Sequence, residues 1–290
     1  MGTEVTLVAP AEADPAVLET ATARTQRTFA HEEQRFSRFR ADSELSRVNA
    51  SAGEWTSVSA GFARLTGFAL EAAWRTGGRF DPTVLPAMIA AGYDRDFDEV
   101  LAGAKGALHP VQPCGRFTEL ELEADRLRMP RGVALDFGGV AKGWTVDLAA
   151  EAALSAGLPW VIVNAGGDLR LDGDVPSMGV EVGVEDPQDR AIELLRVSIS
   201  EGALATSSTL VRSWGSGLHH LIDPRTGAPA DGDVLQATVW AQTCAEAEVR
   251  SKWALLKGPI FLEDTHAVLV MRDGRIVMNL EQAAPMEVSA

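Results

Sequence analysis

This 290-residue sequence has few cysteines, a deficit of basic residues and no long apolar run. Cys114 and Cys244 are too few for a disulfide framework, so we expect two reduced thiols. The 26 Lys and Arg residues against 41 Asp and Glu give a formal net charge of −15. This balance argues against binding of nucleic acid or of an anionic membrane through an extended basic surface. No apolar run reaches the length of a membrane span, so no membrane span is expected.

The N-terminal segment MGTEVTLVAPAEADPAVLE lacks a basic start followed by an apolar core. Neither a signal peptide nor a lipoprotein leader is expected from it, and a cytoplasmic location is favoured. With 46% hydrophobic residues, a chain of this length can bury a full core. The sequence therefore predicts a globular protein that holds any anionic ligand by a few locally placed groups.

Helical and strand patterns alternate along the chain. Apolar residues at helical spacing predict helices over residues 16–39, 60–76, 141–157 and 244–258. Short apolar runs bounded by turn residues predict strands, among them residues 4–9, 134–137, 160–171 and 235–242, and a hairpin around Asp273 and Gly274. Because several strands follow one another directly, antiparallel pairing and an α+β class are favoured over a doubly wound parallel sheet.

The stretch VALDFGGVAKGWTVDLAAEAAL, residues 133–154, places Asp136, Gly138, Gly139 and Lys142 between an apolar run and an amphipathic helix. A strand, a glycine turn and a helix N-terminus together can present backbone N–H groups to an anion, which makes phosphate a candidate ligand. The spacing matches neither the Walker loop nor the dinucleotide fingerprint. A plain strand-to-helix turn with a solvated lysine explains the stretch equally well.

Further polar segments lie where strands are expected to end, and each also has a structural explanation. Asp42 or Ser43 in FSRFRADSELSRVNA is expected to N-cap a short helix. Asp81 precedes Pro82 in GGRFDPTVLP, which favours a turn. The glycines of VNAGGDLRL suit a bulge or the close approach of a ligand. The hydroxyls of ATSSTLV could cap a helix, and HHLIDPRTGAPA could be an ordinary loop.

Taken together, these segments resemble the ApbE family, the FAD:protein FMN transferases. The resemblance runs from MGT through FSRFRADSELSRVN, GGRFDPTV, LDFGGVAKGWTVD, VNAGGDLR, ATSS and HLIDPRTG to an Ala-Glu-rich helix, and so indicates one domain over residues 1–290. It implies an α+β fold of two related halves with largely antiparallel sheets around one flavin site. It also implies a magnesium-dependent enzyme that moves the FMN half of FAD onto a Thr or Ser hydroxyl of an acceptor protein and releases AMP.

The resemblance implies roles for individual residues as well. Phe39 would stack on the isoalloxazine ring, and Asp136 and Lys142 would hold the nucleotide. His220 and Asp223 are the expected catalytic residues; His220 could act as a general base or be a structural imidazole. The other residues implied to line the flavin pocket are Met1, Phe80, Asp81, Pro82 and Ile222.

The implied magnesium ligands are the carbonyl of Gly139 and two positions of the last helix. Relatives usually read Ala-Asp-x-x-x-Thr there, whereas AEAEVRSKW aligns Glu248 with the Asp and Lys252 with the Thr. Glutamate keeps an oxygen ligand, but a protonated lysine has no acceptor. Lys252 could replace part of the metal's charge or form an i,i+4 ion pair with Glu248. An FAD hydrolase and a flavin-binding protein without turnover therefore stay open beside the transferase.

Overall fold

The computed structural model describes residues 3–103, 114–176, 179–215, 217–280 and 286–288. Within them the chain forms two compact units, each built from segments far apart in the sequence. The first, the sheet unit, comprises Met1–Glu32, Val140–Ser208 and Gly232–Ala290, and the second, the helical unit, comprises Glu33–Gly139 and Thr209–Asp231. The strand pairs of the described residues are antiparallel, which confirms the α+β class with antiparallel sheets.

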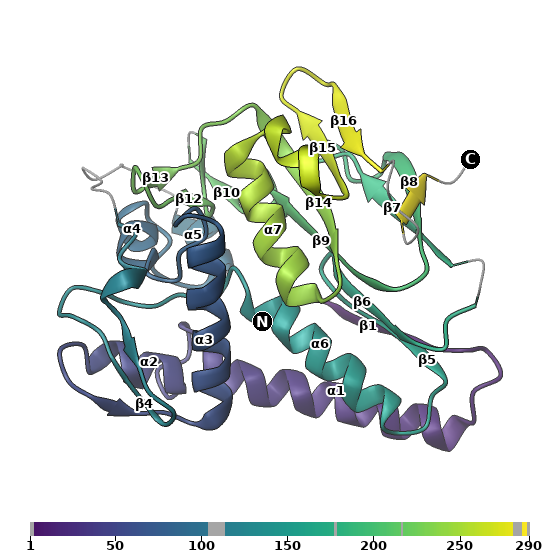
Figure 1. The fold of residues 1–290 in the computed structure, drawn as a ribbon, viewed down its shortest axis with the longest axis horizontal. Coiled ribbons are helices and arrows are strands. Elements are labelled where there is room, and N and C mark those ends of the chain that lie inside the picture. Colours follow the sequence, from purple (N-terminus) through teal and green to yellow (C-terminus); the bar gives the residue numbers. More distant parts are fainter. Residues whose placement is uncertain (1–2, 104–113, 177–178, 216, 281–285, 289–290) are drawn as a thin grey trace. The chain divides into compact units, whose positions relative to one another are not determined.

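The sheet unit is built around a seven-stranded antiparallel sheet (Figure 1). In spatial order its strands are β1 (Val5–Val8), β5 (Trp160–Ala165), β6 (Asp168–Gly173), β9 (Gly202–Ser208), β14 (Val234–Ala241), β15 (Ala267–Met271) and β16 (Ile276–Asn279). Gly166 and Gly167 join β5 to β6 as a two-residue turn with φ of 62° and 95°. Such a turn needs positive φ at both positions, so these glycines make a hairpin and not a bulge.

Helices cover one face of this sheet, and a smaller sheet packs on the other. The helices are α1 (Pro15–Phe36), α6 (Ala141–Leu154) and α7 (Cys244–Lys257), and the smaller sheet consists of β7 (Val180–Glu185), β8 (Glu193–Ile199) and β17 (Met286–Val288). The helical side is lined largely by alanine and valine, so helices and sheet approach closely. The helices α6 and α7 also approach each other closely at Gly143 of α6, where a Cβ would lie 2.5 Å from the carbonyl oxygen of Cys244 at the start of α7.

The helical unit combines helices with short strands. Its helices are α2 (Glu44–Ala50), α3 (Ala60–Arg75), α4 (Leu85–Ala90) and α5 (Phe97–Gly103), and a 3-10 turn, η1, spans Phe117–Glu119. Its strands are β2 (Thr56–Ser57), β3 (Glu121–Leu122), β4 (Arg126–Arg128), β10 (Ser213–Trp214), β11 (Leu218–His219), β12 (Ile222–Asp223) and β13 (Ala228–Pro229). Ser43 caps α2 by accepting the backbone N–H of Ser46 at 3.0 Å, which confirms the capping prediction.

The strand predicted over residues 134–137 is wrong. Leu135 lies outside any strand and is paired with a side chain instead of a neighbouring strand. The Asn49 carboxamide accepts the N–H of Leu135 at 2.8 Å and donates to its carbonyl at 2.9 Å, so the backbone groups are satisfied by one amide. The chain therefore enters the glycine turn from a segment that α2 holds in place.

Two expectations from composition can be compared with the described residues. Cys114 and Cys244 are both free cysteines, which agrees with the expectation that they form no disulfide. Burial raises the pKa of Cys114 to about 11, so its thiol is not a nucleophile near neutral pH. In the part of the chain that the structure describes, no helix combines the length and apolar character needed to cross a membrane.

Candidate functional site

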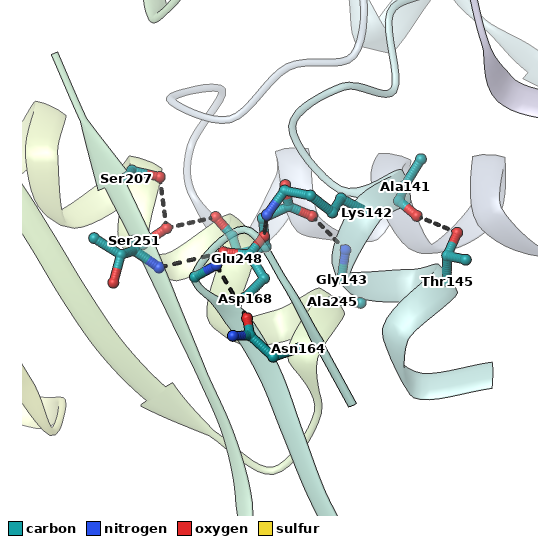
Figure 2. A network of polar contacts seen from close by, with 12 residues as sticks. Ala141, Lys142, Gly143, Thr145, Asn164, Asp168, Ser207, Ala245, Glu248 and Ser251 are labelled. Carbon is teal, nitrogen blue, oxygen red and sulfur yellow. Dashed lines mark hydrogen bonds and ion pairs between the residues drawn. The ribbon is translucent and has the colours of Figure 1, made fainter. Parts of the chain in front are cut away.

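Four charged side chains with little exposure meet in the sheet unit, and we call them the charge cluster. Figure 2 labels Lys142, Asp168 and Glu248 of this cluster. Lys142 comes from the first turn of α6 and Asp168 from the start of β6; their ammonium and carboxylate form an ion pair. Glu248 and Lys252 lie one turn apart on α7, with 3.4 Å between Lys252 Nζ and Glu248 Oε1. The cluster thus holds two positive and two negative charges.

Glu248 is fixed by bonds from two helices. Its side chain is 3% exposed, its Oε2 accepts the N–H of Gly143 at 2.8 Å, and its Oε1 faces the Lys252 ammonium. Burial alone would raise its pKa, but Lys252, Lys142 and the Gly143 N–H lower it below the ordinary value. Glu248 is therefore an anion whose position depends on the close approach of α6 and α7 at Gly143.

Asp168 is the most buried charge of the cluster, with 1% of its side chain exposed. Its Oδ2 pairs with Lys142, and its Oδ1 accepts the backbone N–H of Thr206 on β9 at 3.3 Å. Burial raises the pKa of Asp168, and the Lys142 ammonium opposes that rise. Burial alone would lower the pKa of Lys142, but Asp168 and Glu248 raise it, so this lysine stays charged.

Hydroxyl and amide side chains surround the charge cluster (Figure 2). The Ser251 hydroxyl donates to the carbonyl of Glu248 at 2.9 Å and lies 2.7 Å from the Ser207 hydroxyl of β9. Asn164 accepts the N–H of Gly167 at 3.0 Å with its side-chain oxygen, which closes the turn that leads into Asp168. The hydroxyls of the ATSS segment therefore belong to a strand and not to a helix cap.

Asp147 of α6 holds the first turn of α7. Its carboxylate accepts the N–H of Cys244 at 2.8 Å and that of Ala245 at 2.9 Å. The helix itself offers no partner to these N–H groups, because they lie at its N-terminus, and a negative charge is favourable there. Burial nevertheless raises the pKa of Asp147 to about 6, although both N–H bonds oppose that rise.

Asp147 is expected to make the chain less stable as the pH rises from about 4 to about 6. Its pKa is raised from 3.8 to about 6, so between these values the folded chain keeps a proton that the unfolded chain has lost. The lost stability is about 3 kcal/mol at most, because one pKa unit corresponds to about 1.4 kcal/mol. Urea unfolding of wild type and Asp147→Asn across this range measures it. Identical pH profiles for the two proteins would contradict the assignment.

In the helical unit, an arginine packs against two aromatic rings. The Arg38 guanidinium carbon lies 4.1 Å from the ring centre of Phe39 and 4.4 Å from that of Tyr93. Arg38 Nε pairs with Asp136 Oδ2 at 2.8 Å, and both side chains are less than a tenth exposed. Asp136 Oδ1 accepts the N–H of Gly138 at 2.7 Å. Phe39 is 44% exposed, so an aromatic surface stays accessible above a fixed cation.

Other predicted pocket residues belong to the same unit. The Pro82 carbonyl accepts the N–H of Asp136 at 2.8 Å, which ties the GGRFDPTV segment to the segment of Asp136. Ile222 packs in one apolar cluster with Tyr93 and Trp214, whose rings are 5.5 Å apart. Phe80 of the GGRFDPTV segment is buried. The helical unit thus brings Phe39, Asp136 and Ile222 around Tyr93, the only tyrosine of the sequence.

Asp81 is bound within its own turn. One carboxylate oxygen accepts the N–H and the hydroxyl of Thr83 at 2.8 and 2.6 Å, and the other accepts the N–H of Phe117 at 3.4 Å. Burial raises the pKa of Asp81 more than these bonds lower it. These contacts give Asp81 a structural task in the turn, and its expected place in a flavin pocket stays a prediction.

The two adjacent histidines differ in their surroundings. His219 is buried, its Nε2 contacts the Ala230 carbonyl at 3.0 Å, and its Nδ1 accepts the Leu221 N–H at 3.3 Å. His220 is half-buried, with Nδ1 3.4 Å from the Arg212 carbonyl. Of the pair, His220 is the one accessible to a substrate, and its role as a base stays a prediction.

Asp223, the second expected catalytic residue, is held by Arg225. It accepts Arg225 Nε at 3.0 Å and Nη2 at 2.7 Å, together with the Arg225 backbone N–H at 3.0 Å. Burial alone would raise the pKa of Asp223, but these bonds hold it below its ordinary value. Asp223 is therefore an ionised carboxylate that shapes the turn after β12, and its catalytic role stays a prediction.

The residues of the charge cluster do not fit a magnesium ion. Mg²⁺ takes near-octahedral oxygen ligands at about 2.0–2.1 Å. All four carboxylate oxygens of Asp168 and Glu248 already face an N–H or ammonium donor of this chain. Among the residues that the structure describes, no group of three or more His, Cys, Asp or Glu is placed to hold a metal. The Lys252 ammonium instead pairs with Glu248, as the i,i+4 interpretation expects.

The structure also shows which residues sequence reasoning missed. The sequence patterns do not single out three residues of the site. Asp168 belongs to the charge cluster, and Arg38 and Tyr93 belong to the aromatic contacts of the helical unit. The signal for Asp168 was present, since it directly follows the glycine pair in VNAGGDLR. Of the predicted residues, Met1 lies outside the described part of the chain, and Gly139 lies in the turn before α6.

Comparison with known proteins shows which family this chain resembles. Residues 1–268 match the model of the ApbE family. The FAD:protein FMN transferase of Rhodobacter capsulatus is 32% identical over 202 residues, which cover 67% of this chain and 38% of that protein. That of Vibrio cholerae is 26% identical over 245 residues, which cover 81% of this chain and 73% of that protein.

A solved structure shares the fold over nearly the whole chain. The ApbE protein of Thermotoga maritima superimposes with a TM-score of 0.84 at 24% identity, covering 97% of this chain and 95% of that one. The match to the Rhodobacter capsulatus relative, by contrast, spans well under half of that protein's length. The family resemblance of the sequence segments is confirmed by the family match: this chain belongs to the ApbE family.

Proposed function

We propose that this chain transfers FMN from FAD to a threonine or serine hydroxyl of an acceptor protein and releases AMP. The observation that carries the proposal is the ApbE family match over residues 1–268. This stretch includes the charge cluster and the contacts of Arg38 with Phe39 and Tyr93. Relatives in Rhodobacter capsulatus and Vibrio cholerae are named FAD:protein FMN transferase. The described residues supply an aromatic surface and buried cations, which suit a flavin ring and a diphosphate.

The proposed reaction is a phosphoryl transfer. The acceptor hydroxyl oxygen attacks the phosphorus of the FMN half, and the bond from that phosphorus to the bridging oxygen breaks. AMP leaves with the bridging oxygen, and the hydroxyl proton passes to a base. His220 is the proposed base, because histidine is the side chain best suited in general to exchange a proton near neutral pH, and this one is partly exposed.

Each unit, taken by itself, carries a group of the kind that binds one part of FAD. In the helical unit, the partly exposed Phe39 ring packs against the Arg38 guanidinium. In the sheet unit, Lys142 keeps its charge and leaves 22% of its side chain exposed, so it can donate to a phosphate oxygen. The resemblance also implies a magnesium ion, but the charge cluster does not fit it, and no step of the proposed reaction is assigned to that ion.

Phe39→Ala should weaken FAD binding by roughly 1–3 kcal/mol, the range for loss of one base-on-aromatic stack. Wild type should also bind FAD more tightly than FMN or NAD, as isothermal titration calorimetry can show. Trp74→Ala is the matched control, since Trp74 is 67% exposed and its ring packs on Phe117. Equal affinity for FAD and NAD would count against the flavin assignment itself.

Release of AMP separates the three candidate activities. Purified chain is incubated with FAD, with and without peptides that carry a single threonine or serine, and AMP is quantified by chromatography. AMP that depends on the peptide supports the transferase. AMP that forms equally without peptide indicates the hydrolase, and FAD binding without AMP indicates a flavin-binding protein.

A further inference from the structure

The charge cluster is electrically balanced without a metal. Lys142 and Lys252 supply two positive charges, and Asp168 and Glu248 supply two negative charges. A divalent cation would enter a group with no net negative charge and would meet two ammonium ions. Coulomb repulsion between such near and poorly solvated charges is strong. Electrostatics within the sheet unit therefore opposes binding of a divalent cation.

Lys252 lies where it can contact an anionic ligand as well as Glu248. Its ammonium donates to the Glu248 carbonyl at 3.2 Å and faces the Glu248 carboxylate at 3.4 Å. A lysine ammonium has three donors, and the Lys252 side chain is 16% exposed, so a further donor can meet a phosphate oxygen.

The choice of lysine at both positions is informative. Only 4 of the 26 basic residues are lysine, and 2 of these 4 lie in the charge cluster. An ammonium is a compact point charge, whereas a guanidinium is a broad planar fork. A compact cation is the better substitute for a metal ion beside a carboxylate, and the chain uses one there although it uses arginine almost everywhere else.

We propose that the Lys252 ammonium takes the place of a divalent cation in this chain, so that it binds FAD without magnesium. The inference rests on the proposed function, because it concerns the diphosphate of the same substrate. The fixed charge neutralises Glu248 and donates to the diphosphate, two tasks that a bound ion would otherwise share. It adds one positive charge where Mg²⁺ would add two.

The first test measures the ion itself and does not need catalysis. Mn²⁺ is used as the probe, and its free and bound fractions are read by electron paramagnetic resonance, with and without FAD. Wild type should leave Mn²⁺ free in both cases, whereas Lys252→Thr, which removes the charge and supplies a hydroxyl, should bind it. Binding of one Mn²⁺ by wild type overturns the proposal, as does failure of Lys252→Thr to bind Mn²⁺ when wild type does not.

The second test measures FAD affinity by calorimetry in EDTA and in excess Mg²⁺. Wild type should have the same affinity in both media, and a tenfold loss in EDTA overturns the proposal. Lys252→Met should weaken binding about tenfold in both media, as expected for loss of a charged hydrogen bond. Lys252→Arg keeps the charge and should retain most of the affinity, and Lys257→Met changes an exposed lysine of the same helix as a control.

Failure of the proposed function gives a different result from failure of this inference. A wild type that binds FAD in neither medium contradicts the FAD assignment, while the Mn²⁺ measurement still decides whether Lys252 excludes the ion. Thermal melting of each variant checks folding, since Lys252→Met leaves Glu248 buried without its partner. If that variant does not fold, wild type, Lys252→Thr and Lys252→Arg decide the question.

Discussion

Lys142→Met is expected to lower the free energy of unfolding by about 3–5 kcal/mol, the range for breaking a buried ion pair. Asp168 is 1% exposed and pairs with Lys142, so the substitution leaves a buried carboxylate without its countercharge. Methionine keeps most of the aliphatic stem, so lost packing contributes little. Urea unfolding followed by circular dichroism measures the change, and a loss below about 1 kcal/mol would contradict the assigned pairing.

A double variant separates the charge effect from packing. Lys142→Met combined with Asp168→Asn removes both charges and should recover most of the stability, because no uncompensated ion remains. Lys257→Met is the surface control and should stay within about 0.5 kcal/mol of wild type. If the double variant is as unstable as Lys142→Met alone, the destabilisation comes from packing and not from the buried charge.

His220→Ala should lower the rate of AMP release by ~10²-fold or more while FAD affinity changes little. The expectation follows from the proposed role of His220 as the base for the acceptor hydroxyl, which acts in the transition state and not in FAD binding. The rate is measured with saturating FAD and acceptor peptide, and affinity by calorimetry. A parallel fall in rate and affinity would mark His220 as a structural residue.

The neighbouring histidine is the matched comparison. Both ring nitrogens of His219 contact backbone groups, those of Leu221 and Ala230, so His219→Ala should lower stability and weaken rate and affinity together. The contrast between the two variants tests the assignment more sharply than either alone. Similar behaviour of both variants would contradict a separate chemical role for His220.

Much of the fold could be predicted because its signals are local. The apolar spacing of α1, α3, α6 and α7 and the Ser43 cap follow from neighbouring residues, as does the hairpin of β15 and β16. The strand expected at residues 134–137 failed because its partner is the Asn49 side chain, 86 positions away from Leu135. A backbone segment paired by a side-chain amide can have the same sequence pattern as a strand.

In the candidate site, too, contacts between residues near in sequence could be predicted, and contacts between separate elements could not. The pairing of Glu248 with Lys252 could be predicted, because residues four apart on a helix share a face. The pairing of Lys142 with Asp168 joins a helix to a strand and could not, and the stacking of Arg38 on Tyr93 depends on the packing of the helical unit. Such contacts depend on how elements pack, which no local spacing records.

The most direct test of flavin transfer is the mass of the acceptor after the reaction. Purified chain, FAD and a peptide with one threonine are incubated, and the peptide is analysed by mass spectrometry while AMP is counted in the same sample. The account predicts a peptide heavier by one FMN group, attached at the threonine hydroxyl, with one AMP released for each peptide modified. Release of AMP while the peptide mass stays unchanged, across peptides that carry threonine or serine, would contradict it.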